Sequence, residues 1–251
     1  MQENQDDCKV CKDGKGLGFE LSMAFQPIVD CEKRTVYGHE ALVRGPDGEG
    51  AGWVFEKINN SNRYQFDQTC RVKAIEWASR LGMESRLSIN FMPNAVYEPE
   101  RCIRTTLRAA KDHDFPLDQL IFEVTESERV EDVPHLNNII TYYREHGFLT
   151  AIDDFGAGYA GLNFLAELQT DLVKLDMGLI RDIDSSLTRQ AVVRSIVNFC
   201  RELSIRPVAE GIETQAELNV LKDMGIKLFQ GYLIAKPAFQ SLPEIDWEAI
   251  K

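Results

Sequence analysis

The feature that most constrains the fold is a regular alternation of short apolar runs with longer segments of helical period. Eight apolar runs, each suited to one strand, lie at 23–29, 35–44, 86–91, 120–126, 148–155, 172–176, 206–211 and 227–234. Amphipathic helices are predicted between them at 63–82, 99–114, 132–147, 187–204 and 214–225, with a shorter helix at 160–169. Thr214 and Glu217 match a capping box. Because eight strand–helix units can close into a parallel barrel, the predicted fold class is α/β, a modified TIM (β/α)8 barrel.

Composition limits the classes of partner. Of the 251 residues, 44% are hydrophobic and 27% charged, so a substantial core is available. The formal net charge of −12 argues against broad electrostatic binding to DNA or to an anionic membrane, but permits an anionic small molecule if cations screen the acids. The sequence has no stretch of 18 apolar residues and no apolar signal-peptide segment near residue 1. We therefore expect a soluble, cytoplasmic protein.

The cysteines indicate reduced thiols and one weak motif. Six cysteines, at 8, 11, 31, 70, 102 and 200, show no disulfide-scaffold pattern. Cys8 and Cys11 have CxxC spacing, but a zinc site needs four ligands and no histidine precedes His39. Residues 1–18, rich in Gly, Lys and Asp, are expected to form a flexible leader before a single domain over 19–251.

Polar side chains come late in most of the predicted strands. These residues are Glu40, Asn90, Glu123, Asp153, Lys174 and Glu210, and Glu126 and Asp154 extend two of the strand ends. In a parallel barrel the carboxyl ends of all strands open on one face, where catalytic residues belong. The sequence therefore predicts that several carboxylates converge at one mouth of the barrel.

Converging carboxylates repel one another unless cations bind between them. The candidate ligands are all oxygens, which favours Mg²⁺ or Mn²⁺ over structural zinc. The neighbours Asp153 and Asp154 can serve two metal ions if one carboxylate bridges both. Two such ions suit in-line attack on a phosphodiester. Arg44 could grip a phosphate with two N–H groups, and Lys174 could meet a non-bridging oxygen or the attacking water.

Seven ordered motifs carry a family resemblance. They are EALVR (40–44), INF (89–91), FEVTE (122–126), DDFGAGY (153–159), KLD (174–176), AEGIE (209–213) and FQG (229–231). Together they resemble the EAL-domain cyclic-di-GMP phosphodiesterases, from about Met23 to Phe239. The segment after EALVR looks most similar to EAL domains attached to blue-light-sensing flavin (BLUF) domains, so the chain is either a stand-alone relative or an excised piece.

The resemblance implies a role for each matching position. The first metal ion would be held by Glu40, Asn90, Glu123 and Asp153, and the second by Asp153, Asp154 and Glu210. Lys174 matches the lysine beside the catalytic water, Glu126 matches the glutamate that steadies the DDFG loop, and Glu210 is either a metal ligand or a general base. The positions that would contact the dinucleotide are Gln26, Arg44, Asp154, Glu213 and Gln230.

The family also implies a reaction and an assembly. Members open one phosphodiester of cyclic di-GMP to give linear pGpG, with Mg²⁺ or Mn²⁺. By this resemblance the first strand runs antiparallel to the others, and the protein is a homodimer that is coupled to a sensory domain or partner. No contact with DNA or membrane is implied.

Two departures from the family pattern bear on regulation. Ala157 and Ala160 stand where the DDFG loop usually has Thr and Ser, which removes hydroxyls worth roughly 0.5–1.5 kcal/mol each when hydrogen-bonded. The segment GPDGEGA replaces the usual RWxHP continuation after the EAL motif, at a loop rim. Neither change removes a candidate metal ligand.

Several alternatives remain open at this point. A catalytically silent EAL domain would sense cyclic di-GMP or bind a protein partner. Enolase-type proton abstraction also uses strand-end carboxylates and a lysine, but it needs a capping domain for which 251 residues leave no room. For single residues, Lys174 could pair structurally with Asp171 or Asp176, Gln230 could bond only backbone groups, and Glu213 could serve only the dipole of its helix.

Overall fold

The computed structural model describes residues 17–96, 98–125, 132–158 and 161–250. Its strands are β1 (Ser22–Asp30), β2 (Thr35–Arg44), β3 (Arg86–Asn90), β4 (Leu120–Thr125), β5 (Leu149–Phe155), β6 (Leu172–Leu175), β7 (Arg206–Ala209) and β8 (Leu228–Phe229). Each of the eight predicted runs overlaps one of them, and only β1 extends beyond its predicted run, by one residue at each end. The sheet order is β2-β3-β4-β5-β6-β7-β8-β1, and a further pairing of β1 with β2 closes the barrel. A short ninth strand, β9 (Ala238–Phe239), adds to the outside of β1 and was not predicted.

The first strand runs against its neighbours. β1 pairs antiparallel with both β2 and β8, whereas β2 to β8 pair in parallel. The tight connection between β1 and β2 explains the direction, because two strands joined by a short turn must be antiparallel. In this register Gln26 lies opposite Glu40. The antiparallel strand expected from the family resemblance is therefore confirmed.

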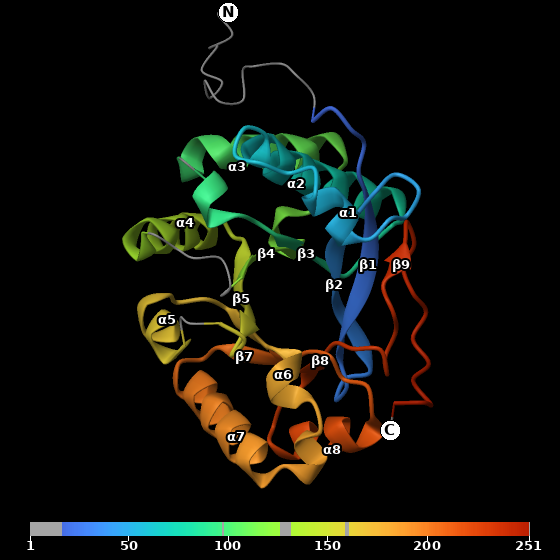
Figure 1. Ribbon diagram of the computed structural model, residues 1–251, viewed down its shortest axis with the longest axis vertical. Coiled ribbons are helices and arrows are strands. Elements are labelled where there is room, and N and C mark those ends of the chain that lie inside the picture. Colours follow the sequence, from blue (N-terminus) through green and yellow to red (C-terminus); the bar gives the residue numbers. More distant parts are fainter. Residues whose placement is uncertain (1–16, 97, 126–131, 159–160, 251) are drawn as a thin grey trace, which may run out of the picture.

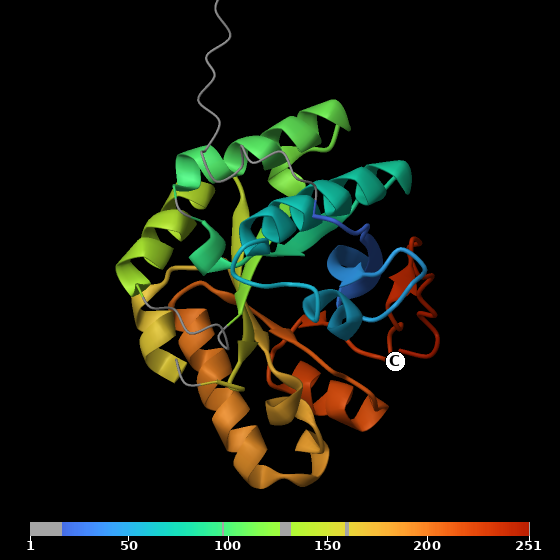
Figure 2. The same cartoon turned by 45° about the horizontal axis from the view of Figure 1, so that its top comes forward.

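Helices surround the strands (Figure 1), and Figure 2 shows the same arrangement after a 45° turn. They are α1 (Ala51–Phe55), α2 (Arg63–Arg80), α3 (Pro99–Asp112), α4 (Val133–Glu145), α5 (Gly161–Glu167), α6 (Met177–Ile180), α7 (Leu187–Glu202) and α8 (Gln215–Asp223). The six predicted helices are found with shorter ends, whereas the short α1 and α6 were missed. Three 3₁₀ turns lie at Pro93–Ala95, Leu117–Gln119 and Ile183–Ser185.

Side-chain caps fix several helix starts. The predicted capping box of α8 is present: the Thr214 hydroxyl accepts from the Glu217 amide, and the Glu217 carboxylate accepts from the Thr214 amide. Asp132 caps α4 and Ser186 caps α7 in the same way. These bonds satisfy amide groups that a helix leaves without partners in its first turn. No described helix is long and apolar enough to cross a membrane.

Two apolar cores support the barrel. The larger core fills the space between the strands and the helices outside them, and it includes Phe122 and Tyr143. The smaller core lies inside the barrel and consists of Ile28, Ile121, Ala151, Leu172, Val208 and Leu228. A barrel of this size has an interior that side chains can fill, so the inner core closes the barrel below its mouth. The mouth above this core is therefore the place for a polar site.

Candidate active site

The predicted site residues form a polar layer directly above the inner apolar core. Moving two residues along the chain from Ile121, Ala151, Leu172, Val208 and Leu228 leads to Glu123, Asp153, Lys174, Glu210 and Gln230. On antiparallel β1, Gln26 comes two residues before Ile28. Because side chains alternate along a strand, residues two apart face the same side, here the interior of the barrel. The repeated step from apolar to polar thus assembles the site from six parts of the chain.

Lys174 on β6 lies at the centre of this layer. Its Nζ is 3.1 Å from Glu40 Oε2, 3.0 Å from Glu123 Oε2, 2.8 Å from Asp153 Oδ1 and 2.8 Å from Glu210 Oε1. The lysine side chain is only 1% exposed. Burial alone would lower the pKa of Lys174, but the surrounding carboxylates outweigh it and raise the pKa well above its usual value. A single buried ammonium group therefore holds four carboxylates together.

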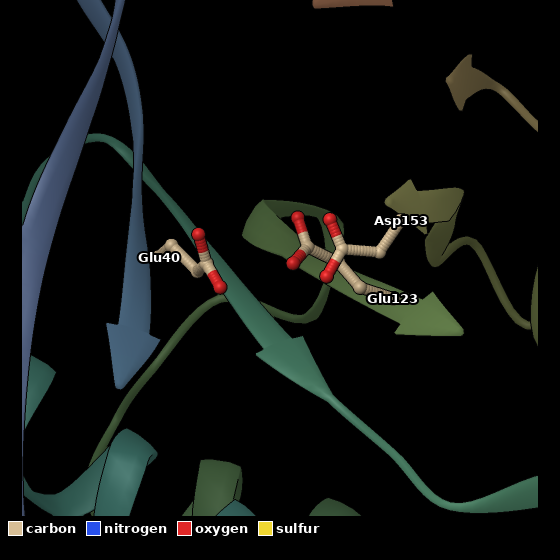
Figure 3. Close-up of side chains that lie close together, drawn as sticks. All are labelled: Glu40, Glu123 and Asp153. Atoms are coloured by element: carbon tan, nitrogen blue, oxygen red, sulfur yellow. The ribbon is translucent and has the colours of Figure 1, made fainter. Parts of the chain in front are cut away.

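The acids form two groups with the spacing of metal ligands, and Asp153 belongs to both. Oxygen atoms of Glu40, Glu123 and Asp153 all lie within 4.8 Å of one another, and so do oxygens of Asp153, Asp154 and Glu210. Figure 3 shows the first group: Glu40, Glu123 and Asp153 come from three different strands and turn toward a common space. The carboxylate oxygens suit Mg²⁺ or Mn²⁺.

Asn90, at the end of β3, completes the first group. Its Nδ2 donates a hydrogen bond to Glu40 Oε1 at 3.0 Å. Its Oδ1 is buried and has no hydrogen-bond partner among the described residues. A buried, unpartnered amide oxygen is costly, and a metal ion would satisfy it. The residues present therefore fit a divalent cation.

The pKa values of the acids shift in different directions, although burial acts to raise each of them. Burial raises the pKa of Glu123 to about 8, against the attraction of Lys174. Burial and the neighbouring Asp153 raise the pKa of Asp154 to about 6. Burial also raises the pKa of Glu210 well above its usual value. For Glu40, burial would raise the pKa, but Lys174 and several hydrogen bonds outweigh it and lower the value.

A backbone irregularity brings both consecutive aspartates to the mouth of the barrel. The pairing of β5 with β6 shifts register between Ile152 and Phe155. Within this bulge Asp154 has a φ of 54°, in the left-handed region that aspartate tolerates better than most residues. In a regular strand, successive side chains point to opposite faces. The bulge therefore allows Asp153 and Asp154 to share one site.

Two cavities meet at Asp153. The polar one has a volume of about 280 Å³ and is lined by Gln26, Glu40, Asp153, Asp154, Lys174, Asp176, Met177, Glu210, Gly211, Glu213, Gln230, Gly231 and Tyr232. The second is larger, about 500 Å³, mostly apolar, and includes Arg44, Asn90 and Asp153 in its lining. The candidate site thus has an acidic half and an apolar half.

The predicted dinucleotide contacts are placed at different parts of these cavities. Gln230 Nε2 donates to Glu40 Oε2 at 2.8 Å and to Gln26 Oε1 at 3.2 Å, so its side chain is not occupied by backbone groups. Glu213 lies at the rim of the acidic cavity and forms a two-pronged ion pair with Arg181, at 2.6 and 2.7 Å. Arg44 lies in the apolar cavity, where its Nη1 donates to the Val43 carbonyl at 2.8 Å.

The alternative prediction, that Lys174 pairs structurally with Asp171 or Asp176, is wrong. Asp171 instead accepts from the amide and the hydroxyl of Thr150, and Asp176 caps α6 through the amide of Gly178. Glu126 lies outside the described residues, as do Cys8 and Cys11.

Two residues near the site escaped the sequence analysis. Ser88 donates to Glu123 Oε1 at 2.5 Å, and its position two residues before Asn90 could have revealed it by strand alternation. Arg181 follows the short helix α6, which lacked a recognisable helical period, so nothing in the sequence linked it to Glu213.

Comparison with known protein families gives one match over most of the chain. The model of the EAL domain family matches residues 17–237. Among curated relatives, the blue light- and temperature-regulated antirepressor BluF of Escherichia coli is 31% identical over 225 residues, which is 89% of this chain and 56% of BluF. The cyclic di-GMP phosphodiesterase PA2567 of Pseudomonas aeruginosa is 30% identical over 93% of this chain and 40% of that protein. The chain thus spans about half the length of these two relatives.

The solved structures that this chain resembles include EAL proteins. A standalone versatile EAL protein from Vibrio cholerae O395, in its c-di-GMP-bound form, has a TM-score of 0.90 and 54% identity, over 93% of this chain and 98% of that one. Klebsiella pneumoniae BlrP1, in a complex with manganese and cyclic di-GMP, has a TM-score of 0.85 and 36% identity, over 93% of this chain and 59% of that one.

Proposed function

Because the chain belongs to the EAL domain family, we propose that it hydrolyses cyclic di-GMP to linear 5′-pGpG with the help of two divalent cations, Mg²⁺ or Mn²⁺. The observation that carries the proposal is the pair of acidic groups that share Asp153 at the mouth of the barrel. Relatives named as cyclic di-GMP phosphodiesterases, and the manganese and cyclic di-GMP complex of BlrP1, support it.

The chain's own residues divide into two ligand sets. Glu40, Asn90, Glu123 and Asp153 would hold the first ion, and Asp153, Asp154 and Glu210 the second. When bound, such ions activate water and stabilise the oxygens on which charge develops during phosphodiester cleavage. Because Asp153 belongs to both acidic groups, the two ligand sets lie next to each other.

Lys174 and Glu210 are suited to proton and charge control. The raised pKa of Lys174 keeps its ammonium charged, so it can donate to a non-bridging phosphate oxygen or orient the attacking water. Glu210 is suited to two roles, as ligand of the second ion and as acceptor of a proton from that water, because its carboxylate belongs to the second acidic group and burial raises its pKa above the usual value. Glu126 is assigned the family role of steadying the DDFG loop.

The rim residues are proposed to position the dinucleotide. Gln26 and Gln230 lie side by side beside Glu40, and Gln230 Oε1 is buried with no hydrogen-bond partner among the described residues. Arg44 projects from the end of β2 into the apolar cavity, where a phosphate and an aromatic base can be held together. Asp154 and Glu213 complete the set.

The decisive assay is chromatographic detection of pGpG after incubation with cyclic di-GMP and Mn²⁺, with and without a chelator. We expect product only when free metal is present. Turnover that persists in excess chelator would contradict the metal dependence, and metal-loaded protein that forms no product would contradict the activity.

A second candidate function is regulation without catalysis, because the relative BluF is named an antirepressor. In that case the barrel would bind cyclic di-GMP or a protein partner and leave the ester intact. The same incubation separates the two functions: a binding isotherm for cyclic di-GMP with no pGpG would favour the regulator. The complete set of candidate metal ligands favours the enzyme.

We further propose that residues 19–251 form the phosphodiesterase domain, that it works in the cytoplasm as a homodimer, and that a sensory domain or partner controls it. The family match over residues 17–237 supports the first part. Light scattering of the purified chain tests the dimer, and a monomeric mass during full turnover would contradict it.

A further inference from the structure

A buried ion pair lies on α2, behind the strands that supply the first ligand set. Arg71 Nη2 is 2.5 Å from Asp67 Oδ2, and the two side chains are 0% and 1% exposed. Burying both charges is expensive, and apolar side chains of similar volume are often as stabilising or more so. Stability alone therefore does not explain why this helix carries the pair.

The second oxygen of Asp67 holds the backbone just beyond β3. Its Oδ1 accepts a hydrogen bond from the amide of Met92 at 2.9 Å. Met92 comes two residues after Asn90, whose Oδ1 is buried without a hydrogen-bond partner among the described residues and whose Nδ2 donates to Glu40 of the first ligand set. A carboxylate that accepts from a backbone amide fixes the chain more firmly than a neutral acceptor does.

Arg71 pairs with Asp67 and also lies against aromatic rings next to two of the candidate metal ligands. Its Nη1 donates to the hydroxyl of Tyr143 on α4 at 3.1 Å. Its guanidinium lies 5.7 Å from the ring centre of Phe91 and 5.6 Å from that of Phe122. Phe91 directly follows Asn90 in the chain, and Phe122 directly precedes Glu123.

We propose that Asp67 is a positioning residue of the metal centre. Through the Met92 amide, Asp67 holds the backbone just beyond β3 so that the Asn90 amide oxygen is directed toward the carboxylates. Arg71 is the counter-ion that fixes Asp67. This inference rests on the proposed metal-dependent function. Asp67 acts on the metal through the backbone, as outer residues around metal sites commonly do, and replacing such residues weakens metal binding about 10–100-fold.

Two double variants isolate the bond to Met92. Asp67→Leu with Arg71→Met removes both charges and the acceptor, whereas Asp67→Asn with Arg71→Met removes both charges but keeps an oxygen that can accept from Met92. Mn²⁺ affinity is measured by the electron paramagnetic resonance signal of free Mn²⁺, without substrate. We expect the Leu/Met variant to bind Mn²⁺ about 10–100-fold more weakly, and the Asn/Met variant to bind close to wild type.

Turnover gives a second readout. At saturating Mn²⁺ the Leu/Met variant should recover most of its kcat, because only the occupancy of the metal site is impaired. If both variants bind Mn²⁺ like the wild type, or both lose affinity equally, the inference fails. It also fails if Mn²⁺ affinity is unchanged while KM for cyclic di-GMP rises, since Asp67 lines the apolar cavity and would then contact substrate directly.

Folding failure and failure of the proposed function are distinguishable from these results. Thermal unfolding checks each variant, and if the Leu/Met protein does not fold, Met92→Pro removes the donor without substituting Asp67 or Arg71, with the same expected loss of Mn²⁺ affinity. Wild-type protein that binds no Mn²⁺ would overturn both proposals. Wild-type protein that binds Mn²⁺ but forms no pGpG would overturn only the function, because the affinity comparison still tests Asp67.

Discussion

Replacing Lys174 with methionine tests whether its ammonium group is the internal counter-ion of the acids. The substitution keeps a long side chain but removes the charge that lies within 3.1 Å of four carboxylates. Removing one partner from a buried ion pair costs about 3–5 kcal/mol, because the remaining charge stays buried without compensation. For a domain of this size each kcal/mol shifts Tm by roughly 2–4 °C, so we expect Tm in chelator to fall by roughly 6–20 °C.

The pH dependence of this loss follows from the acids that remain. Burial already raises the pKa of Glu123 to about 8 while Lys174 is present, and removal of the cation raises it further. A folded-state carboxyl with a raised pKa binds more protons than the unfolded chain, so its cost is greatest at high pH and is relieved as pH falls. The variant should therefore lose more stability at pH 9 than at pH 6.

The assay is thermal unfolding, monitored by circular dichroism, in chelator and in Mn²⁺. Mn²⁺ should raise the Tm of Lys174→Met more than that of the wild type, because the metal replaces the missing cation. Lys227→Met is the matched control, since its ion pair with Glu32 is exposed and such pairs contribute about 0–1 kcal/mol. An unchanged Tm for Lys174→Met in chelator, with equal Mn²⁺ stabilisation of both proteins, would refute the reasoning.

Four further substitutions test other parts of the structure. Asp153→Asn and Glu210→Ala should each abolish pGpG formation, because each removes a carboxylate from the second acidic group, and near-normal turnover would contradict the assigned role. Glu217→Gln should lower the free energy of unfolding at pH 7 by about 1 kcal/mol in urea titrations. Burial would raise the pKa of Glu217, but amide hydrogen bonds hold it below 4.5, so this contribution should disappear as pH falls below that value. Gly231→Ala should lower the free energy of unfolding by about 1–3 kcal/mol and reduce turnover, because the added methyl group overlaps the backbone of Ile212 beside Glu210. An unchanged free energy of unfolding would show that the backbone of this loop can shift to make room for the methyl group.

The main architecture was predictable because it follows from strong, repeated patterns. The alternation of apolar runs and helices located every barrel strand, and the topology of a parallel barrel implied that late residues such as Glu123 and Asp153 would meet. The capping box at Thr214 and Glu217 was predictable from local chemistry alone. These features depend on sequence neighbours or on one global rule.

The missed features depend on packing between distant segments. The helices α1 and α6 have only five and four residues, too few to show a helical period. The pairing of Arg181 with Glu213 joins residues from two different connections. The sequence placed Lys174 at a strand end, but its position between four carboxylates depends on how far the side chain reaches across the barrel.

The left-handed backbone of Asp154 has a consequence for how this protein can diverge. Asparagine and glycine adopt that conformation with little strain, whereas branched or bulky residues do not. A change to either would preserve the turn and the barrel while deleting one acidic oxygen donor. A single substitution could therefore remove the proposed chemistry without loss of folding, and such a descendant would keep the cavities that we propose hold the dinucleotide.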